Sequence, residues 1–119
     1  MKKILVIDDS PVVREQLGAV LGRAGFAVVE ACDGLDAITK VDDTIGMMLC
    51  DVNMPHMNGL EMLEQLKADA KWTAVPVVML TTEGHPSLIL RAKKAGAKGW
   101  LVKPFNPEQL VATVRRFVS

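Results

Sequence analysis

The chain has 119 residues, which suffices for one domain with a single hydrophobic core. Half of the residues are hydrophobic, yet no apolar run reaches the roughly 20 residues of a membrane-spanning helix, and the start MKKILVIDD turns acidic too early for a secretory signal peptide. We therefore expect a soluble cytoplasmic protein, and the net charge of zero argues against nucleic acid as the default ligand.

The first half of the chain alternates apolar runs with amphipathic segments. Residues 4–7 are continuously apolar and end at Asp8 and Asp9, which is typical of a strand covered on both faces. Ser10, directly before a proline, predicts a helix N-cap, and the helical spacing continues until Gly25 stops it. A more polar strand at 26–30, a short helix at 35–41 and an apolar strand at 45–50 follow.

The second half repeats the alternation. Asn58 and Gly59 open a helix that runs to residue 66, and prolines introduce a buried strand at 77–80 and helices at 86–95 and 107–117, with a strand at 99–102 between the two helices. Five strand-helix units in strict alternation predict an α/β fold, a doubly wound parallel sheet with five strands and helices on both faces. The common strand order for this plan is 2-1-3-4-5, in which the first and third strands flank the switch point.

Polar side chains end four of the predicted strands: Asp8 and Asp9, Asp51, Thr81 and Lys103, in that order. Because ligands bind outside the carboxyl ends of parallel strands, we expect these side chains to converge. Three carboxylates in one crevice repel one another without a cation, and oxygen ligands with room for water favour Mg²⁺. A carboxylate beside Mg²⁺, a lysine and a hydroxyl meets the needs of phosphoryl transfer to an aspartate, which makes Asp51 the candidate acceptor.

These motifs together resemble the receiver domain of two-component response regulators over residues 3–117. The resemblance rests on the Asp8-Asp9 pair, the segment DVNMPHMNG that starts at Asp51, Thr81 thirty positions later, and the triplet KPF that starts at Lys103. It implies one flavodoxin-like, CheY-like receiver domain over residues 1–119. It also implies a Mg²⁺ site made by Asp8, Asp9, the Asp51 side chain and the backbone carbonyl of Asn53.

The resemblance further implies that Asp51 takes a phosphoryl group from a histidine kinase or phosphotransfer protein. Thr81 and Lys103 would contact the phosphoryl oxygens, and the peptide bond before Pro104 would be cis. Single-domain length, Asn53 and Glu83 are similar to chemotaxis regulators of the CheY type. Two positions depart from the family pattern: Trp100 stands where the switch residue is usually Tyr or Phe, and Thr82 where a small residue is usual.

Other functions remain open at this point. A Mg²⁺-dependent phosphatase with an aspartyl nucleophile usually carries a second acid two positions later, where this chain has Asn53. Turnover of a phosphomonoester would favour that enzyme, whereas one labile phosphate per chain would favour a signalling domain, which we expect. The chain also fits a receiver fragment of a longer regulator with a C-terminal output domain, or a non-phosphorylated interaction domain of the same fold.

The output surface is expected in the basic last quarter of the chain. Residues 91–119 carry 7 basic and 1 acidic residue, whereas residues 1–90 carry 7 and 13. If the apolar side of the fourth helix faces the sheet, Leu90 points to solvent, with Trp100 beneath the same surface. Phosphorylation would then change the face made by the fourth helix, fifth strand and fifth helix, and a target protein would bind there. We expect a monomer or weak dimer that binds neither nucleic acid nor membrane.

We expect the cysteines and histidines to take no part in the chemistry of the site. Cys32 and Cys50 lack the spacing of a metal pair and are predicted to be buried thiols. His56 and His85 fall in loops and are predicted to be solvated.

Overall fold

The computed structural model describes residues 2–52, 59–68, 75–81 and 86–118. Strands and helices alternate strictly along the chain: β1 (Lys3–Ile7), α1 (Pro11–Arg23), β2 (Val28–Ala31), α2 (Gly34–Lys40), β3 (Ile45–Asp51), α3 (Gly59–Lys67), β4 (Val77–Thr81), α4 (Pro86–Lys94), β5 (Gly99–Val102) and α5 (Pro107–Phe117). All strand pairs are parallel, and the sheet order β2-β1-β3-β4-β5 confirms the predicted topology. Within those ranges, no helix is both long enough and apolar enough to cross a membrane.

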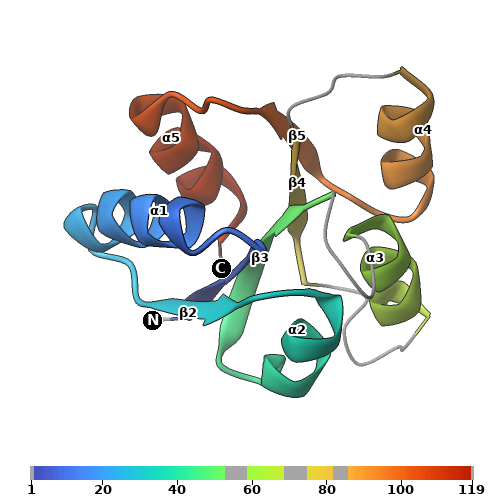
Figure 1. Ribbon diagram of the computed structural model, residues 1–119, viewed down its shortest axis with the longest axis horizontal. Coiled ribbons are helices and arrows are strands. Elements are labelled where there is room, and N and C mark those ends of the chain that lie inside the picture. The colour runs from blue at the N-terminus through green and yellow to red at the C-terminus, as the bar shows by residue number, and fades with distance from the viewer. Residues whose placement is uncertain (1, 53–58, 69–74, 82–85, 119) are drawn as a thin grey trace.

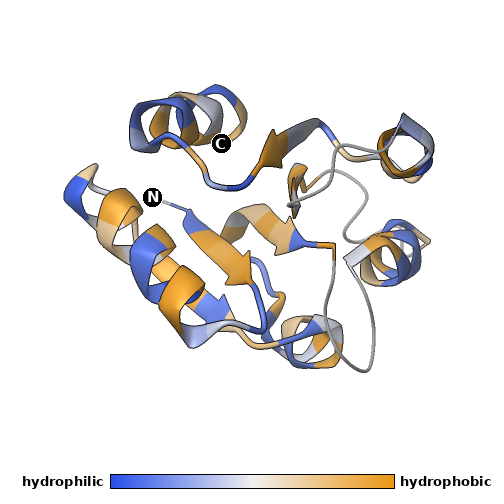
Figure 2. Ribbon diagram, turned by 45° about the horizontal axis from the view of Figure 1, so that its top comes forward, coloured by the Kyte–Doolittle hydropathy of each residue, from blue (hydrophilic) through white to orange (hydrophobic). Residues whose placement is uncertain are grey.

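The helices cover both faces of the sheet (Figure 1). Alternate residues of a strand face opposite sides, so Ile4 and Val6 pack toward α1 and α5, whereas Leu5 and Ile7 pack toward α2, α3 and α4. The central strands are accordingly hydrophobic along most of their length (Figure 2). Burial of the sheet on both faces explains why β1, β3 and β4 appear in the sequence as continuous apolar runs.

Two of the central strands end one residue later than the sequence predicts. β3 includes Asp51, which pairs in register with Leu80, and β4 includes Thr81, which pairs with Val102. Both polar residues therefore belong to the strand ladder, which fixes their backbone. β2 starts at Val28 rather than at residue 26, because the residue pairs with β1 begin there.

Helix ends follow the predicted signals. The Ser10 hydroxyl accepts a hydrogen bond from the Val13 N–H at 3.3 Å and caps α1. Gly25 and Gly96 have positive φ angles of 95° and 105° after α1 and α4, a conformation that glycine adopts without the steric cost of a Cβ. The N-cap of α2 is Asp33, whose carboxylate accepts from the Asp36 N–H at 2.8 Å, so this helix starts one residue before the predicted position.

The two cysteines differ in exposure. Cys50 is buried in β3 as predicted, but Cys32 is exposed, so the prediction that both are buried is wrong for Cys32. The reason is local: Cys32 lies just beyond β2, and its backbone N–H donates to the Asp36 carboxylate at 3.0 Å. The side chain therefore belongs to the turn into α2, outside the sheet.

Candidate functional site

The carboxyl ends of four adjacent strands bring the predicted side chains to one edge of the sheet. Asp8 follows β1, Asp51 ends β3, Thr81 ends β4 and Lys103 follows β5. Because β1, β3, β4 and β5 are successive neighbours, these four residues are neighbours as well. Asp8, Asp51 and Thr81 are buried, whereas Asp9 is exposed. The sheet thus assembles the predicted constellation with one side open to solvent.

Asp8, Asp9 and Asp51 form a compact acidic cluster. Each offers one carboxylate oxygen, and these oxygens all lie within 4.8 Å of one another. Carboxylates this close repel one another, and two of the three are shielded from water. An all-oxygen donor set of this size, with an exposed member on the solvent side, fits a hard divalent cation that keeps part of its water shell, as Mg²⁺ does.

Lys103, which follows β5, brings a positive charge to this acidic cluster. Its ammonium nitrogen Nζ donates to Asp8 Oδ2 at 2.7 Å and lies 3.5 Å from Asp51 Oδ2. Its backbone N–H donates to the Thr81 carbonyl at 2.7 Å, and the Lys103–Pro104 peptide bond is cis, as the family resemblance implies. Lys103 is mostly buried and bridges two acids, so it offsets part of their mutual repulsion.

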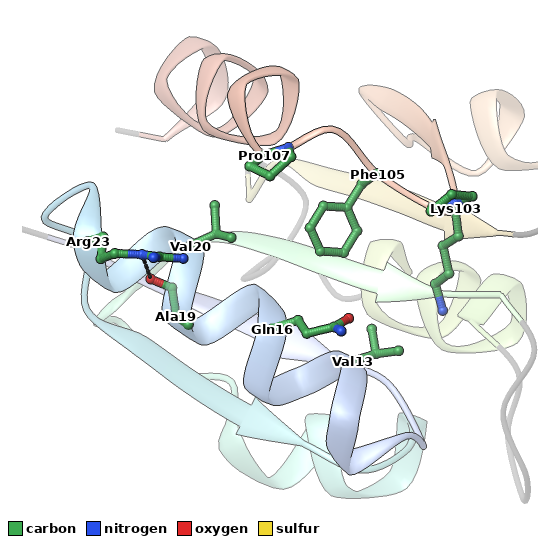
Figure 3. Close-up of a pocket in the computed structure, with 9 residues that line it drawn as sticks. Val13, Gln16, Ala19, Val20, Arg23, Lys103, Phe105 and Pro107 are labelled. Atoms are coloured by element: carbon green, nitrogen blue, oxygen red, sulfur yellow. Dashed lines mark hydrogen bonds between the residues drawn. The ribbon is translucent and has the colours of Figure 1, made fainter.

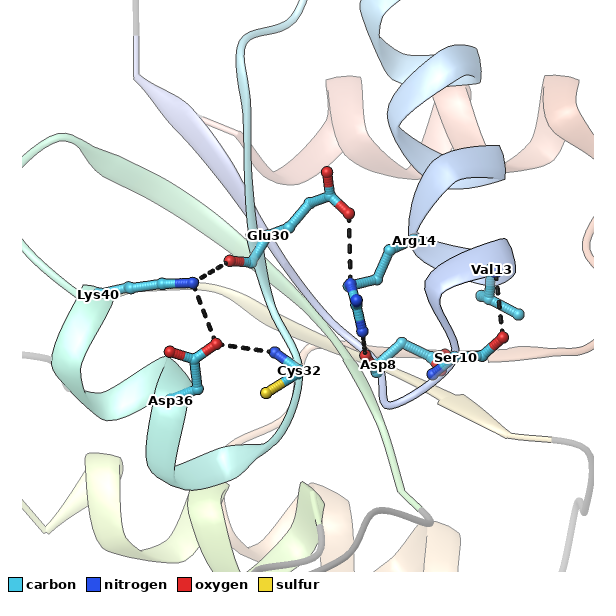
Figure 4. Close-up of polar contacts among 8 residues, drawn as sticks. All are labelled: Asp8, Ser10, Val13, Arg14, Glu30, Cys32, Asp36 and Lys40. Atoms are coloured by element: carbon cyan, nitrogen blue, oxygen red, sulfur yellow. Dashed lines mark hydrogen bonds and ion pairs between the residues drawn. The ribbon is translucent and has the colours of Figure 1, made fainter.

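Asp8 is held by contacts that sequence reasoning did not find (Figure 4). The Ser10 N–H donates to Asp8 Oδ1 at 2.9 Å, and Arg14 Nη1 donates to the Asp8 carbonyl at 2.6 Å. The same guanidinium forms an ion pair with Glu30 on β2, with Nε 3.3 Å from Oε1. Arg14 therefore ties α1 to the ends of β1 and β2. The available signal was an arginine one turn into the helix that follows an acidic pair.

The backbone of Asp51 is enclosed by Cys50 and Gly59. The Cys50 thiol donates to the Asp51 carbonyl at 3.3 Å, and burial, with the charges of Asp51 and Asp8, raises the pKa of this thiol well above its ordinary value. Cys50 is therefore a neutral packing residue. A Cβ placed on Gly59 would lie 2.2 Å from the Asp51 carbonyl oxygen and 3.0 Å from Cys50 Sγ. The first residue of α3 thus reaches the strand that carries Asp51 only because it has no side chain.

A groove of about 580 Å³ lies beside Lys103, between α1 and the segment that leads into α5 (Figure 3). Its walls are mainly apolar, with Val13 and Val20 on α1 facing Phe105 and Pro107. The acidic cluster therefore has an apolar flank.

This arrangement agrees with what comparison with known proteins finds. Residues 4–115 match the sequence model of the response regulator receiver domain. The chain belongs to this family. The receiver domain is 38% identical to the chemotaxis protein CheY1 of Helicobacter pylori over 111 residues, which cover 91% of this chain and 90% of that protein. It is 40% identical to a chemotaxis protein CheY homolog of Campylobacter jejuni over 112 residues, 91% of this chain and 85% of the relative.

A solved structure agrees as well. The chemotaxis protein CheY4 of Vibrio cholerae superposes with a TM-score of 0.93 at 39% identity, covering 99% of both chains. The receiver domain therefore has the predicted flavodoxin-like, CheY-like fold and resembles chemotaxis response regulators in particular. Receiver domains generally bind Mg²⁺ at an acidic pocket, and the cluster of Asp8, Asp9 and Asp51 has the matching composition.

The two predicted output residues of the receiver domain lie on different sides of α4. Leu90 is 53% exposed, as predicted, but it lines a groove toward α3. Trp100 instead lines a separate cavity of about 60 Å³ with Ile89 and Lys93, and its indole N–H is buried with no hydrogen-bond partner among the described residues. The prediction that Leu90 and Trp100 share one surface is therefore wrong. Periodicity places Leu90 away from the sheet but does not say which neighbouring helix it faces.

Several residues singled out in the sequence lie outside the described ranges. They are Asn53, His56, Thr82, Glu83 and His85.

Proposed function

We propose that this receiver domain is the phosphoacceptor of a cytoplasmic two-component chemotaxis phosphorelay. Asp51 would receive the phosphoryl group from the phosphohistidine of a histidine kinase or phosphotransfer protein. The observation that carries the proposal is the charge arrangement around Asp51. Its carboxylate lies within 4.8 Å of acidic oxygens of Asp8 and Asp9, and 3.5 Å from the Lys103 ammonium. Similarity to CheY proteins supports the chemotaxis pathway.

In the proposed transfer, an Asp51 carboxylate oxygen forms the new P–O bond while the P–N bond of the phosphohistidine breaks. The bonding electrons leave with the imidazole. Lys103, already beside Asp51, and the hydroxyl of Thr81 on the neighbouring strand would bind the phosphoryl oxygens. Asp8, Asp9, the Asp51 side chain and the Asn53 carbonyl would hold Mg²⁺, which would offset the charge of the incoming group.

Positioning of Asp51 supports this role. Its backbone is fixed by the ladder with β4 and by the close approach of Gly59. A nucleophile held in one place needs little reorganisation when the donor arrives, which is a large part of the benefit of a folded site. The apolar flank beside Lys103 would contact the partner that carries the phosphohistidine.

The output of the proposed switch is binding of a target protein at the surface formed by α4, β5 and α5. Trp100 lies on β5 and contacts the core on the α4 side, so it is placed to transmit a change at Thr81 to this surface. The chain would act as a signalling domain that assists only its own phosphorylation and dephosphorylation. We expect it to act as a monomer or weak dimer.

Incubation with a small acyl phosphate and Mg²⁺, followed by intact mass measurement, tests the proposal. We expect one added phosphoryl group per chain, and none for Asp51→Asn. Asp43→Asn is the matched control, because Asp43 is an exposed acid elsewhere on the surface and its replacement should leave incorporation unchanged. Full incorporation in Asp51→Asn would refute the assignment. Sustained hydrolysis of a phosphomonoester would show an enzyme instead.

A further inference from the structure

A second groove lies between α3 and α4, away from the apolar flank beside Lys103. It encloses about 620 Å³. Glu64 and Lys67 line it from α3, and Leu90, Arg91 and Lys94 line it from α4. The groove thus combines three basic side chains and one acidic side chain with an exposed leucine.

The charges on the two walls are not equivalent. Arg91 pairs with Glu64 across the groove through two contacts, Nη2 to Oε1 at 2.7 Å and Nε to Oε2 at 3.2 Å. The Lys67 ammonium donates to the Val75 carbonyl at 2.5 Å. Lys94 is exposed and makes no hydrogen bond or ion pair within the part of the chain that the structure describes. Pairing of Lys94 with a partner would therefore break no hydrogen bond or ion pair with a described residue.

We propose that this groove between α3 and α4 is a docking surface for an acidic, amphipathic segment of a partner protein. An apolar side chain of the segment would cover Leu90, one carboxylate would pair with Lys94, and a second would share Arg91 with Glu64. Charge complementarity selects this occupant, since the lining carries more positive than negative charge around an apolar centre. A nucleic acid fits less well, because its phosphates offer no aliphatic side chain to cover the exposed Leu90.

The α3 wall of the groove begins beside Asp51, and the α4 wall follows the strand that ends at Thr81. α3 starts at Gly59. Its N–H donates at 2.9 Å to the carbonyl of Val52, the residue that follows Asp51. α4 starts at Pro86, five positions after Thr81. A change at Asp51 or Thr81 would therefore shift the walls relative to each other. This coupling, which rests on the proposed function, predicts that the acidic segment binds phosphorylated and unphosphorylated protein with different affinities.

A matched pair of lysines on α4 makes the docking surface testable. Lys94 lines the groove, whereas its neighbour Lys93 lines the small cavity beside Trp100. Lys94→Glu and Lys93→Glu change the net charge of the same exposed helix equally. Only the first reverses a charge in the groove.

The probe is a synthetic helical peptide with glutamates on one face and leucines on the other, titrated into the full, isotope-labelled chain. We expect amide shifts along α3 and the facing side of α4. Lys94→Glu should weaken binding about tenfold, whereas Lys93→Glu should weaken it much less. Leu90→Ser, at an exposed position, should weaken binding without changing the circular dichroism spectrum.

Several results would overturn the docking surface. They are the absence of binding, shifts confined to β5 and α5, equal weakening by the two lysine variants, or equal binding of a peptide with lysines in place of the glutamates. Displacement of the peptide by a single-stranded oligonucleotide at the same concentration would overturn the choice of occupant. Equal affinity of the peptide for the protein with and without beryllofluoride, a mimic of the phosphoryl group, would overturn the coupling between phosphorylation and docking. Failure of the proposed function would instead appear as no phosphoryl incorporation at Asp51.

Discussion

Replacement of Gly59 by alanine is expected to displace β3, the strand that carries Asp51. Gly59 has an ordinary helical backbone, so alanine is acceptable conformationally and only the space for its Cβ matters. That space is missing, because the new atom would lie 2.2 Å from the Asp51 carbonyl oxygen. Backbone atoms cannot rotate away as a side chain does, so β3 and the start of α3 must separate.

The size of the effect follows from overpacking at a buried site. Forcing extra atoms into a packed region typically costs about 1–3 kcal/mol. For a chain of 119 residues, 1 kcal/mol corresponds to roughly 4 °C in the melting temperature, so we expect a decrease of about 4–12 °C. Gly18→Ala is the control: Gly18 lies inside α1 with nothing within 4 Å of its added Cβ, and alanine should stabilise the helix by about 0.5–1 kcal/mol.

Thermal unfolding of both variants and their phosphorylation by an acyl phosphate provide the measurement. Gly59→Ala should melt lower and incorporate phosphate more slowly, while Gly18→Ala should melt slightly higher and incorporate it normally. If Gly59→Ala matches Gly18→Ala in both assays, the close approach of α3 to Asp51 does not hold the site together.

Three further predictions concern the charges. Asp9→Ala should reduce the Mg²⁺-dependent rise in melting temperature, and an unchanged rise would exclude Asp9 as a ligand. Lys103→Met should slow phosphorylation yet tighten Mg²⁺ binding measured by calorimetry, because the ammonium no longer competes for Asp8; weaker Mg²⁺ binding would contradict this. The Cys32 N–H and Lys40 lower the pKa of the Asp36 carboxyl. The ionised Asp36 carboxylate therefore stabilises the fold at pH values above the ordinary carboxyl pKa. This stabilisation is lost as the pH falls through the lowered pKa. The melting temperature of Asp36→Asn should therefore depend less on pH in that acidic range, and a curve parallel to that of the parent would argue against it.

The sequence predicted those features that depend on local patterns. Continuous apolar runs identified β1, β3 and β4. The polar residues at their ends were predicted to converge and do so, because parallel strands bring their carboxyl ends to one edge of the sheet regardless of the connecting loops. Ser10 and the glycines that end helices could be found for the same reason: their signals lie within a few residues of the structure they determine.

The features that the sequence did not reveal depend on how distant elements pack. Arg14 reaches Asp8 and Glu30 only because α1 lies over the ends of two strands. Leu90 faces α3 because of the orientation of α4, which helical periodicity does not determine. A register set by pairing with β1 placed Cys32 beyond its strand and into solvent.

The contrast between the two cysteines gives this domain a native reporter of local opening. Thiol reagents attack exposed thiolates, so Cys50 can react only in molecules in which β3 has become accessible, whereas Cys32 reacts from the folded state. When reclosing is fast, the labelling rate of Cys50 is proportional to the population of that opened form. Any ligand that tightens the strand carrying Asp51 should slow labelling of Cys50 and leave that of Cys32 unchanged.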